Sequence, residues 1–378
     1  MKKSLLALTV LSAFTGAASA QSSVTVYGVV DLAMRNVHNN SGSITSQVNG
    51  ALNSNRLGFK GTEDLGGGLS ANFVLESDIF ADTGQAGGNT TTPVPANQFW
   101  SRMSYVGLKS ASLGEVRLGR DYNPVFFTVA GYDPFGYVGV GSISNFFTST
   151  QVSAVFSAFG PATTSYSTLV RAGNSVAYYT PKTLGGFFAS AMGALGEGGS
   201  TGASGNSKFW SLRAGYSAGP ISVDGSYAET KNTNLAGQAF KEAAIGGSYD
   251  FGIVKLMAEY AQLKYVTAKS AVYMVSANGP AGEVGVWKVS YGRVNQSGTA
   301  PTALGATAAG ASIDDRDASQ IAAGYAYNLS KRTALYGQAA RIMNKGSNAG
   351  FSISGGPALL AGADRKSTAF EVGIRHLF

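Results

Sequence analysis

Alternation of apolar and polar side chains with a period of two is the feature that most limits what this chain can fold into. Residues 24–35 carry Val, Gly, Leu or Met at every second position, and polar side chains lie between them: Thr25, Tyr27, Asp31 and Arg35. Successive side chains of a β-strand point to opposite faces, so this pattern predicts a strand with one apolar face. The alternation returns at residues 56–60, 210–216 and 320–327. Segments of about ten residues can cross a hydrocarbon layer as tilted strands.

The connections between these segments alternate between short and long. Short turns rich in Gly, Pro, Asp or Asn fall at residues 63–68, 110–114, 183–186, 217–220, 250–252, 278–282 and 328–331. The intervening polar connections fall near residues 38–52, 81–96, 122–172, 195–206, 230–239, 266–270, 295–317 and 344–365. Short turns at one end and long loops at the other are typical of an outer-membrane barrel. The segments predict about sixteen antiparallel strands, enough to enclose an aqueous channel.

The first twenty residues have the pattern of an export signal. Lys2 and Lys3 precede an apolar run at residues 5–14, and the small residues Ala18 and Ala20 end the segment. This order predicts a signal peptide over residues 1–20 and a mature chain over residues 21–378. A membrane anchor is the alternative, but the apolar run is shorter than the roughly 20 residues that span a bilayer.

The last segment has its apolar side chains on one face and ends on an aromatic residue. Phe370, Val372, Ile374, His376 and Phe378 occupy alternate positions. We expect this strand to seal the barrel, with Phe378, His376 and Ile374 forming an assembly signal. A soluble edge strand is the alternative interpretation.

Composition excludes several classes of protein. Cysteine is absent and charged residues make up 13% of the chain, so disulfides and zinc-thiolate sites cannot support the fold. The formal net charge is +7, which becomes an excess of five once the two leader lysines are removed. No basic cluster with interleaved aromatics suggests nucleic-acid binding. The small excess can tilt a pore towards anions.

An enzyme or a metal site is not expected. The only histidines are His38, in a predicted loop, and His376, on the predicted lipid face, so neither a Ser-His-Asp triad nor a histidine metal site can be assembled. Asp314, Asp315 and Asp317 form an acidic cluster without the spacing of an EF-hand, and a solvated loop explains them. We therefore expect no cofactor.

Three stretches resemble a known family: RLGFKGTEDLGGGLSANFVLE at residues 56–76, SKRTALYGQAARI at residues 330–342 and EVGIRHLF at residues 371–378. They are similar to the Gram-negative porins of β-proteobacteria such as Burkholderia, Bordetella and Comamonas. The resemblance covers the whole mature chain. It implies a sixteen-stranded antiparallel transmembrane β-barrel with its third external loop, about 122–172, folded inward as a constriction. It also implies an outer-membrane homotrimer latched by the second external loop, about 81–96, and surrounded by lipid and lipopolysaccharide. Small ions and polar solutes would cross by passive diffusion.

The resemblance also indicates where the constriction should lie. Alternation turns Arg56 and Arg102 away from the apolar face, where a basic side chain at mid-membrane would cost about 2–4 kcal/mol. They resemble the basic wall of a porin constriction, and the family's arginine at the end of the inward loop corresponds to Arg171. Arg120 lies in LGRDY, which resembles the family's fifth strand, whereas simple alternation places Arg117 in the lumen. Which of these two faces the lumen stays open.

The acidic side of the constriction departs from the family. Where the family carries a Pro-Glu-Phe-Gly-like motif, residues 133–136 read DPFG, so Asp133 is the expected acid. The missing glutamate weakens the acidic side and favours anions. The alternative for each arginine is a structural ion pair with Asp121, Asp31 or Glu76.

The sequence is also compatible with two functions other than passive diffusion. The barrel could be a surface adhesin or structural protein whose lumen stays closed. It could also be a substrate-specific channel, which an aromatic track in the third loop would support. The candidate track residues are Tyr122, Phe126, Phe127, Phe146 and Phe147.

Overall fold

The computed structural model describes residues 23–87, 98–148, 152–159, 168–196, 208–231, 237–301, 308–346, 350–360 and 365–378. The leader predicted over residues 1–20 lies outside the described residues. So does most of the trimer latch expected at about 81–96, of which only residues 81–87 are described.

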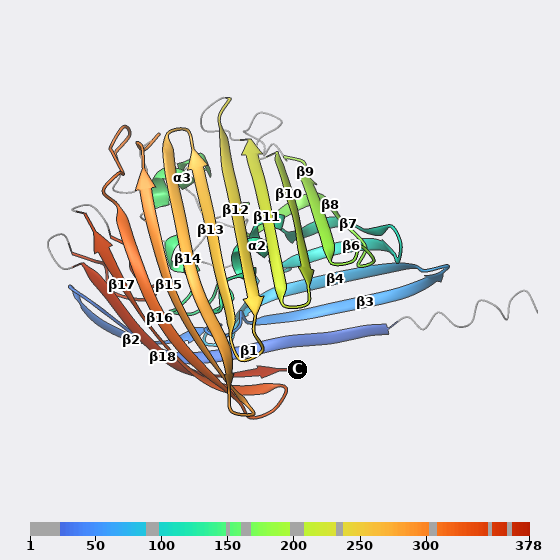
Figure 1. Cartoon of the computed structure of the whole chain (residues 1–378), viewed down its shortest axis with the longest axis horizontal. Coiled ribbons are helices and arrows are strands. Elements are labelled where there is room, and N and C mark those ends of the chain that lie inside the picture. Colours follow the sequence, from blue (N-terminus) through green and yellow to red (C-terminus); the bar gives the residue numbers. More distant parts are fainter. Residues whose placement is uncertain are drawn as a thin grey trace, which may run out of the picture.

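The described chain is dominated by β-strands, all joined in antiparallel pairs (Figure 1). The strands are β1 Ser23–Asn39, β2 Gly42–Asn49, β3 Arg56–Gly66, β4 Leu69–Phe80, β5 Gln85–Ala86, β6 Met103–Ser110, β7 Gly114–Tyr122, β8 Arg171–Tyr179, β9 Phe187–Ala194, β10 Phe209–Ala218, β11 Ile221–Lys231, β12 Ala239–Asp250, β13 Lys255–Tyr265, β14 Ala268–Ala281, β15 Gly285–Ser297, β16 Asp317–Asn328, β17 Thr333–Lys345 and β18 Lys366–Leu377.

These strands close into a barrel of sixteen spans. Both β2 and β3 pair with β1, so together they make one span that residues 50–55 interrupt. The two-residue strand β5 pairs only with the end of β4 and is not a span of its own. Strand β18 pairs with β1 from Val29↔Leu377 to Asn39↔Ser367, which closes the sheet. A closed sheet leaves no unpaired edge in lipid, and the sixteen-stranded prediction is confirmed.

The first external connection is shorter than the sequence suggested. Residues 38–52 were expected to form a loop, but β1 runs to Asn39 and β2 begins three residues later. The polar side chains in this stretch pair across the hairpin, since Asn36 Nδ2 donates to Ser43 Oγ at 3.1 Å and to Thr45 Oγ1 at 2.7 Å. Polar composition therefore marks a solvated extension of the barrel here, and it was mistaken for a loop.

The two faces of the strands have the expected chemistry. On β1, Val24 and Val26 are 65% and 53% exposed on the outer face, whereas Asp31 is fully buried inside. The same contrast holds on β18, where Phe370 and Val372 are exposed and Glu371 is buried between them. An apolar outer band with a polar interior is the arrangement that a barrel in lipid requires.

The third external loop folds into the barrel. It carries α2 Pro124–Gly131, η2 Ile143–Phe146, α3 Ser153–Phe156 and η4 Ser157–Phe159. Helix α2 packs on β10, β11 and β12, and α3 packs on β13 and β14, so both lie behind that wall in Figure 1. Asn123 caps α2 by accepting from Val125 N, and Pro124 opens the helix. Within the described residues no helix is both long enough and apolar enough to span a membrane.

Candidate functional site

One side of the third loop is fastened to β11 through a buried carboxylate. Asp224 accepts the hydroxyl of Thr128 and, at 2.8 Å, the hydroxyl of Tyr132. Arg213 Nη2 lies 2.7 Å from the same carboxylate. Burial raises the pKa of Tyr132 to about 12, and the nearby Asp224 carboxylate adds to this shift. Tyr132 therefore stays a neutral hydrogen-bond donor at physiological pH, and the loop is held by charge-assisted bonds.

The other side of the loop is fastened to β16 and β18. Gln320 Oε1 accepts from Asn145 Nδ2 at 2.8 Å, and Gln320 Nε2 donates to the carbonyl oxygen of Gly141 at 2.9 Å. Glu371 Oε1 accepts from Val140 N at 2.9 Å. Because Gln320 is only 2% exposed, breaking these bonds would leave buried polar groups unpaired. The loop thus lies against the wall from β10 round to β18.

Asp133 does not line the lumen as the sequence suggested. It is 5% exposed, and its carboxylate accepts from Phe135 N at 2.9 Å, Tyr137 N at 3.0 Å, Ser142 Oγ at 3.0 Å and Ile143 N at 3.2 Å. Burial raises the pKa of Asp133 above its usual value, and these donors oppose the shift. A short acid after a helix is a strong local acceptor for backbone N–H groups. Asp133 therefore shapes the loop from within.

Arg102 is the buried centre of a polar cluster on the opposite wall. Its Nε lies 2.6 Å from Glu76 Oε1, its Nη1 lies 2.9 Å from Asp78 Oδ1, and its Nη2 donates to Tyr122 Oη at 2.6 Å. The residue is 4% exposed. Arg102 thus forms an ion pair with Glu76, one of the partners expected for a structural arginine. Two carboxylates compensate this guanidinium, so it contributes little field of its own.

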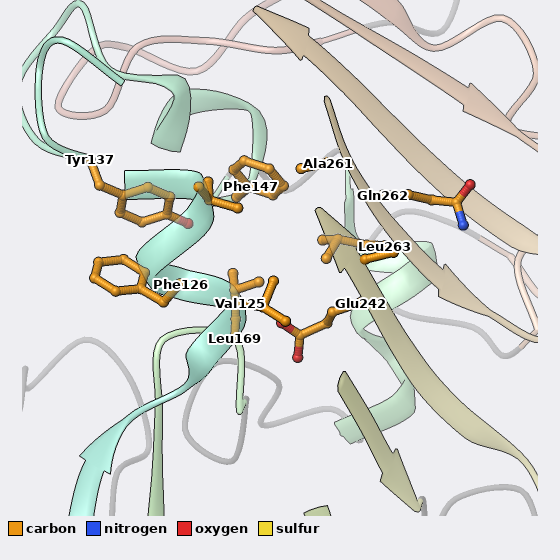
Figure 2. Close-up of a pocket in the computed structure, with 11 residues that line it drawn as sticks. Val125, Phe126, Tyr137, Phe147, Leu169, Glu242, Ala261, Gln262 and Leu263 are labelled. Carbon is orange, nitrogen blue, oxygen red and sulfur yellow. The ribbon is translucent and has the colours of Figure 1, made fainter. Parts of the chain in front are cut away.

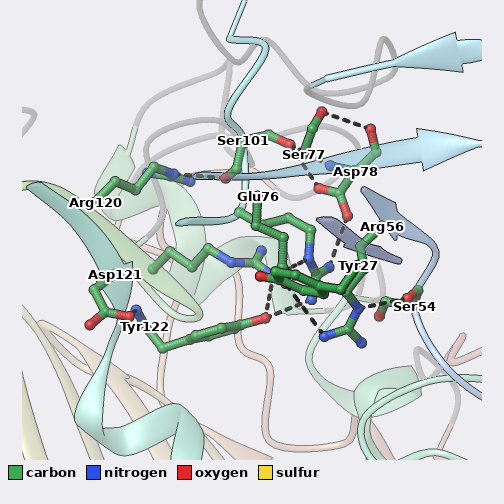
Figure 3. Close-up of polar contacts among 12 residues, drawn as sticks. Tyr27, Ser54, Arg56, Glu76, Ser77, Asp78, Ser101, Arg120, Asp121 and Tyr122 are labelled. Carbon is green, nitrogen blue, oxygen red and sulfur yellow. Dashed lines mark hydrogen bonds and ion pairs between the residues drawn. The ribbon is translucent and has the colours of Figure 1, made fainter. Parts of the chain in front are cut away.

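Two further arginines share partners with Arg102 but are less compensated: Arg171 shares Tyr122, and Arg56 shares Glu76. Figure 3 shows Arg56, Glu76 and Tyr122 in this cluster. Arg171 Nη2 donates to Tyr122 Oη at 2.9 Å, and its guanidinium lies 4.5 Å from the centre of the Tyr122 ring. Arg56 Nε donates to the carbonyl oxygen of Ser54 at 3.2 Å, while its Nη1 is 3.9 Å from Glu76 Oε2. The Tyr122 phenol holds Arg171 without neutralising it, and Arg56 has only a long ion pair with a carboxylate that Arg102 shares.

An irregularity in β7 gives Arg117 and Arg120 different partners. The register between β7 and β8 shifts between Gly119 and Asp121, so strict alternation fails there. Arg117 forms a separate ion-paired group, 2.8 Å from Glu115 and 2.9 Å from Asp121. Arg120 instead lies at the edge of the Arg102 cluster, because its Nε donates to the carbonyl oxygen of Ser101, the residue before Arg102, at 2.7 Å. Sequence alternation could not anticipate this shift.

The charges of this cluster do not balance. Four guanidinium groups, those of Arg56, Arg102, Arg120 and Arg171, lie around the two carboxylates of Glu76 and Asp78. Among the described residues, neither Arg120 nor Arg171 has a carboxylate within 4.0 Å. The sequence did not single out Asp78. Alternation along β4 could have indicated Asp78, because it places positions 76 and 78 on the same face of the strand.

The loop's aromatic residues form a stack that begins at this cluster. Tyr122 stacks on Phe126 with ring centres 5.2 Å apart, Phe126 meets Tyr137 edge-on at 5.1 Å, and Tyr137 stacks on Phe147 at 6.0 Å. The last three rings line a small cavity of about 10 Å³ beside Glu242 (Figure 2). That volume is about one water molecule, so the cavity holds no solute.

This stack does not form the continuous track that a substrate-specific channel would require. Phe146 and Phe147 are 0% and 2% exposed. Phe146 packs edge-on against Phe351 with ring centres 5.8 Å apart. These two rings therefore belong to the packing between the loop and the barrel.

The C-terminal residue closes the barrel through its backbone. Phe378 N donates to Gly28 O at 3.1 Å, and Gly28 N donates to Phe378 O at 3.0 Å. Ile374 and Phe378 are 49% and 45% exposed on the outer face. The exposed His376 lies with its Nδ1 2.9 Å from Thr333 Oγ1. Gly28 leaves room for the terminal ring, which a Cβ at that position would meet at 2.3 Å.

Comparison with known proteins agrees with this architecture. Residues 7–347 match the family described as Gram-negative porin. The outer membrane porin protein 32 of Delftia acidovorans is 36% identical over 389 residues, covering all of both chains. An outer membrane porin of Bordetella pertussis is 30% identical over 426 residues, again covering all of both chains.

Solved structures show the same fold. The anion-selective porin from Comamonas acidovorans superimposes with a TM-score of 0.76 at 34% identity, covering 95% of this chain and 100% of that one. A trimer form of an outer membrane protein of Vibrio cholerae shares the fold at a TM-score of 0.64 and 14% identity, over 94% of this chain and 99% of that one. The chain therefore belongs to the Gram-negative porin family, and it forms a water-filled channel for passive diffusion across the outer membrane rather than an enzyme.

Proposed function

We propose that this porin is a homotrimer with a mild preference for anions, set by the uncompensated arginines of the cluster around Tyr122. The observation that carries the proposal is the charge imbalance of that cluster. Arg102 is neutralised by Glu76 and Asp78, whereas Arg171 is held by the Tyr122 phenol. We infer that the passage between this cluster and the third loop is the constriction.

Fixed charge acts strongly in such a passage. Low-dielectric walls focus the field of the guanidinium groups, which raises the local concentration of anions and lowers that of cations. Screening by salt limits the range of this field. The Debye length is about 10 Å at 0.1 M ionic strength and about 3 Å at 1 M. The preference should therefore be largest at low salt.

Two of the comparisons support the proposal. The Comamonas acidovorans structure, at 34% identity, is described as an anion-selective porin. The Vibrio cholerae protein was solved in a trimer form. We further propose that lipids of the outer membrane, including lipopolysaccharide, contact the part of the outer face that lies outside the trimer interface.

The proposal is tested by replacing Arg56 and Arg171 together with glutamine. Glutamine keeps a polar side chain of related reach, so the barrel should assemble, while two positive charges leave the passage. In planar bilayers under a low-salt KCl gradient, the zero-current potential should move from the anion side towards zero or to the cation side. The single variant Arg120→Gln should produce a smaller shift, because Arg120 lies at the edge of the cluster.

A matched control removes two charges far from the cluster. Lys182 and Lys331 lie in short turns at the opposite end of the barrel from the long loops. The double variant Lys182→Gln/Lys331→Gln should keep the parent's zero-current potential. An unchanged potential in the Arg56/Arg171 variant would show that these arginines are structural and that another region sets ion preference.

A further inference from the structure

A row of three lysines crosses the outer face of the barrel at its external end. Lys241 on β12 is directly opposite Lys264 on β13, and Lys264 is directly opposite Lys269 on β14. All three lie within three residues of the external end of their strands. Neighbouring strands are about 4.8 Å apart, so the side chains of such a row are adjacent.

The lysines point away from the lumen. Each is preceded or followed in the chain by a buried, inward residue: Glu242 beside Lys241, Leu263 beside Lys264, and Ser270 beside Lys269. These three neighbours are 1%, 2% and 0% exposed. Because alternate side chains of a strand face opposite sides, the lysines lie on the membrane side of the wall.

The row is unfavourable for the protein alone. Like charges directly opposite each other across strands destabilise a sheet. Glu229 is 4.0 Å from Lys241 at the edge of the row. Within the part of the chain that the structure describes, Lys264 and Lys269 have no ion-pair partner. An external anion would relieve this repulsion, and a sheet that keeps three such lysines with one acidic side chain at the edge of the row suggests an external ligand.

The position of the row along the barrel indicates which anion it meets. Tyr260 and Tyr273 form an aromatic pair on the same outer face, with ring centres 4.9 Å apart, nearer the middle of β13 and β14. Such aromatics mark the edge of the hydrocarbon layer in barrels of this kind. The lysines lie beyond the pair on the side of the long external loops, at the level of the lipid headgroups of the outer leaflet.

Outward basic residues gather on this half of the barrel. On β11–β18, alternation turns eight of them outward in the half of each strand nearer its external end: Lys231, Lys241, Lys264, Lys269, Arg293, Arg341, Lys345 and Lys366. Within the described residues of β1–β6, alternation turns no Lys or Arg outward. The eight spans β11–β18 are thus suited to anionic headgroups, and the four spans that β1–β6 form are suited to apolar contact.

We propose that Lys241, Lys264 and Lys269 form a binding site for the phosphate groups of an anionic glycolipid in the outer leaflet. Three ammonium groups in one row can share the charge of one phosphorylated headgroup, while the tyrosine pair below them contacts its acyl chains. This inference deepens the lipid contact proposed above and assigns it to one site.

The test compares bound lipid on the intact protein and on a variant. Native mass spectrometry of the detergent-purified protein is used to measure binding of bisphosphorylated lipid A and of its fully dephosphorylated form. The triple variant Lys241→Gln/Lys264→Gln/Lys269→Gln should bind the bisphosphorylated lipid about tenfold or more weakly than the parent. A control that removes three other charges, Lys182→Gln/Lys331→Gln/Arg332→Gln, should bind it as the parent does.

Further arms identify the ligand and separate this inference from the proposed ion preference. The parent should prefer the bisphosphorylated lipid over the dephosphorylated one, and inorganic phosphate at equal concentration should not displace it. Equal binding by parent and triple variant, or equal binding of both lipids, would overturn the inference, and so would displacement by free phosphate. The triple variant should keep the parent's zero-current potential, so failure here leaves the arginine test unaffected.

Discussion

At the scale of single residues, alternation located the arginines but not their partners. Arg56 and Arg102 lie on the inner face as their positions predict, because a basic side chain is costly on the lipid face. Their different roles depend on Glu76 and Asp78 of the neighbouring strand, which the register brings within 2.6 and 2.9 Å of Arg102. Periodicity predicts the face of the strand on which a side chain lies. Ion pairing depends in addition on which strand is adjacent and on the register between the two strands.

Asp133 shows the same limit of sequence reasoning. It was expected to face the lumen because a family motif has an acid nearby. Its surroundings are set instead by the loop's own turns, which bring four donors to one carboxylate. Local hydrogen bonding of this kind depends on the folded loop and cannot be seen in the spacing of residues.

Replacing Asp133 by asparagine should therefore alter the loop rather than ion preference. Asparagine can accept fewer of the four bonds, at a cost of about 1–3 kcal/mol for buried donors left unpaired. Single-channel recordings should show more frequent current fluctuations, while the low-salt zero-current potential stays close to that of the parent. A clear increase in anion preference would instead place the Asp133 charge in the permeation path.

At the scale of elements, strand faces and the order of turns and loops were predictable, while irregularities were not. The third loop was expected inside the barrel, and hydrogen bonds to β11, β16 and β18 hold it there. The break between β2 and β3 and the register shift in β7 have no signature in a period of two. Both irregularities lie next to an arginine of the cluster: the break at residues 50–55 precedes Arg56, and the register shift in β7 falls at Arg120.

The closing strand gives a prediction at this scale. Deleting Phe378 removes both backbone hydrogen bonds to Gly28 and exposes an edge that lipid cannot satisfy. The truncated protein should accumulate unassembled in the periplasm, measured by heat-modifiability of the outer-membrane fraction on gels. Phe378→Leu keeps the backbone bonds and an apolar side chain, so it should assemble. Normal assembly of the truncated protein would show that the C-terminal residue is dispensable.

At the scale of the whole molecule, two parts of the outer face differ in chemistry. Outward positions of β1–β6 are mainly apolar, with Val26, Met34 and Val106 at least half exposed. Outward positions of β11–β18 carry the basic residues described above. An exposed apolar face without basic residues suits contact between barrels, whereas a basic rim suits lipid headgroups.

The trimer can be measured directly. We expect light scattering of the protein in mild detergent, corrected for bound detergent, to give the mass of three chains. Heating should dissociate the assembly before the barrel loses its β-sheet signal in circular dichroism. A single-chain mass with an intact barrel would contradict the trimer and would leave the apolar face of β1–β6 to lipid.

The central claim is that the lumen is open and that net positive charge near Tyr122 makes it favour anions. The zero-current potential of the parent protein, recorded in a planar bilayer at a fixed KCl ratio but rising total salt, tests this claim most directly. We expect stepwise channel insertion, a potential on the anion side near 0.1 M, and a decline of that potential towards zero near 1 M as the Debye length falls from about 10 Å to about 3 Å. Absence of conductance would indicate a closed structural barrel, and a cation-side potential at low salt would contradict the proposed role of the arginines.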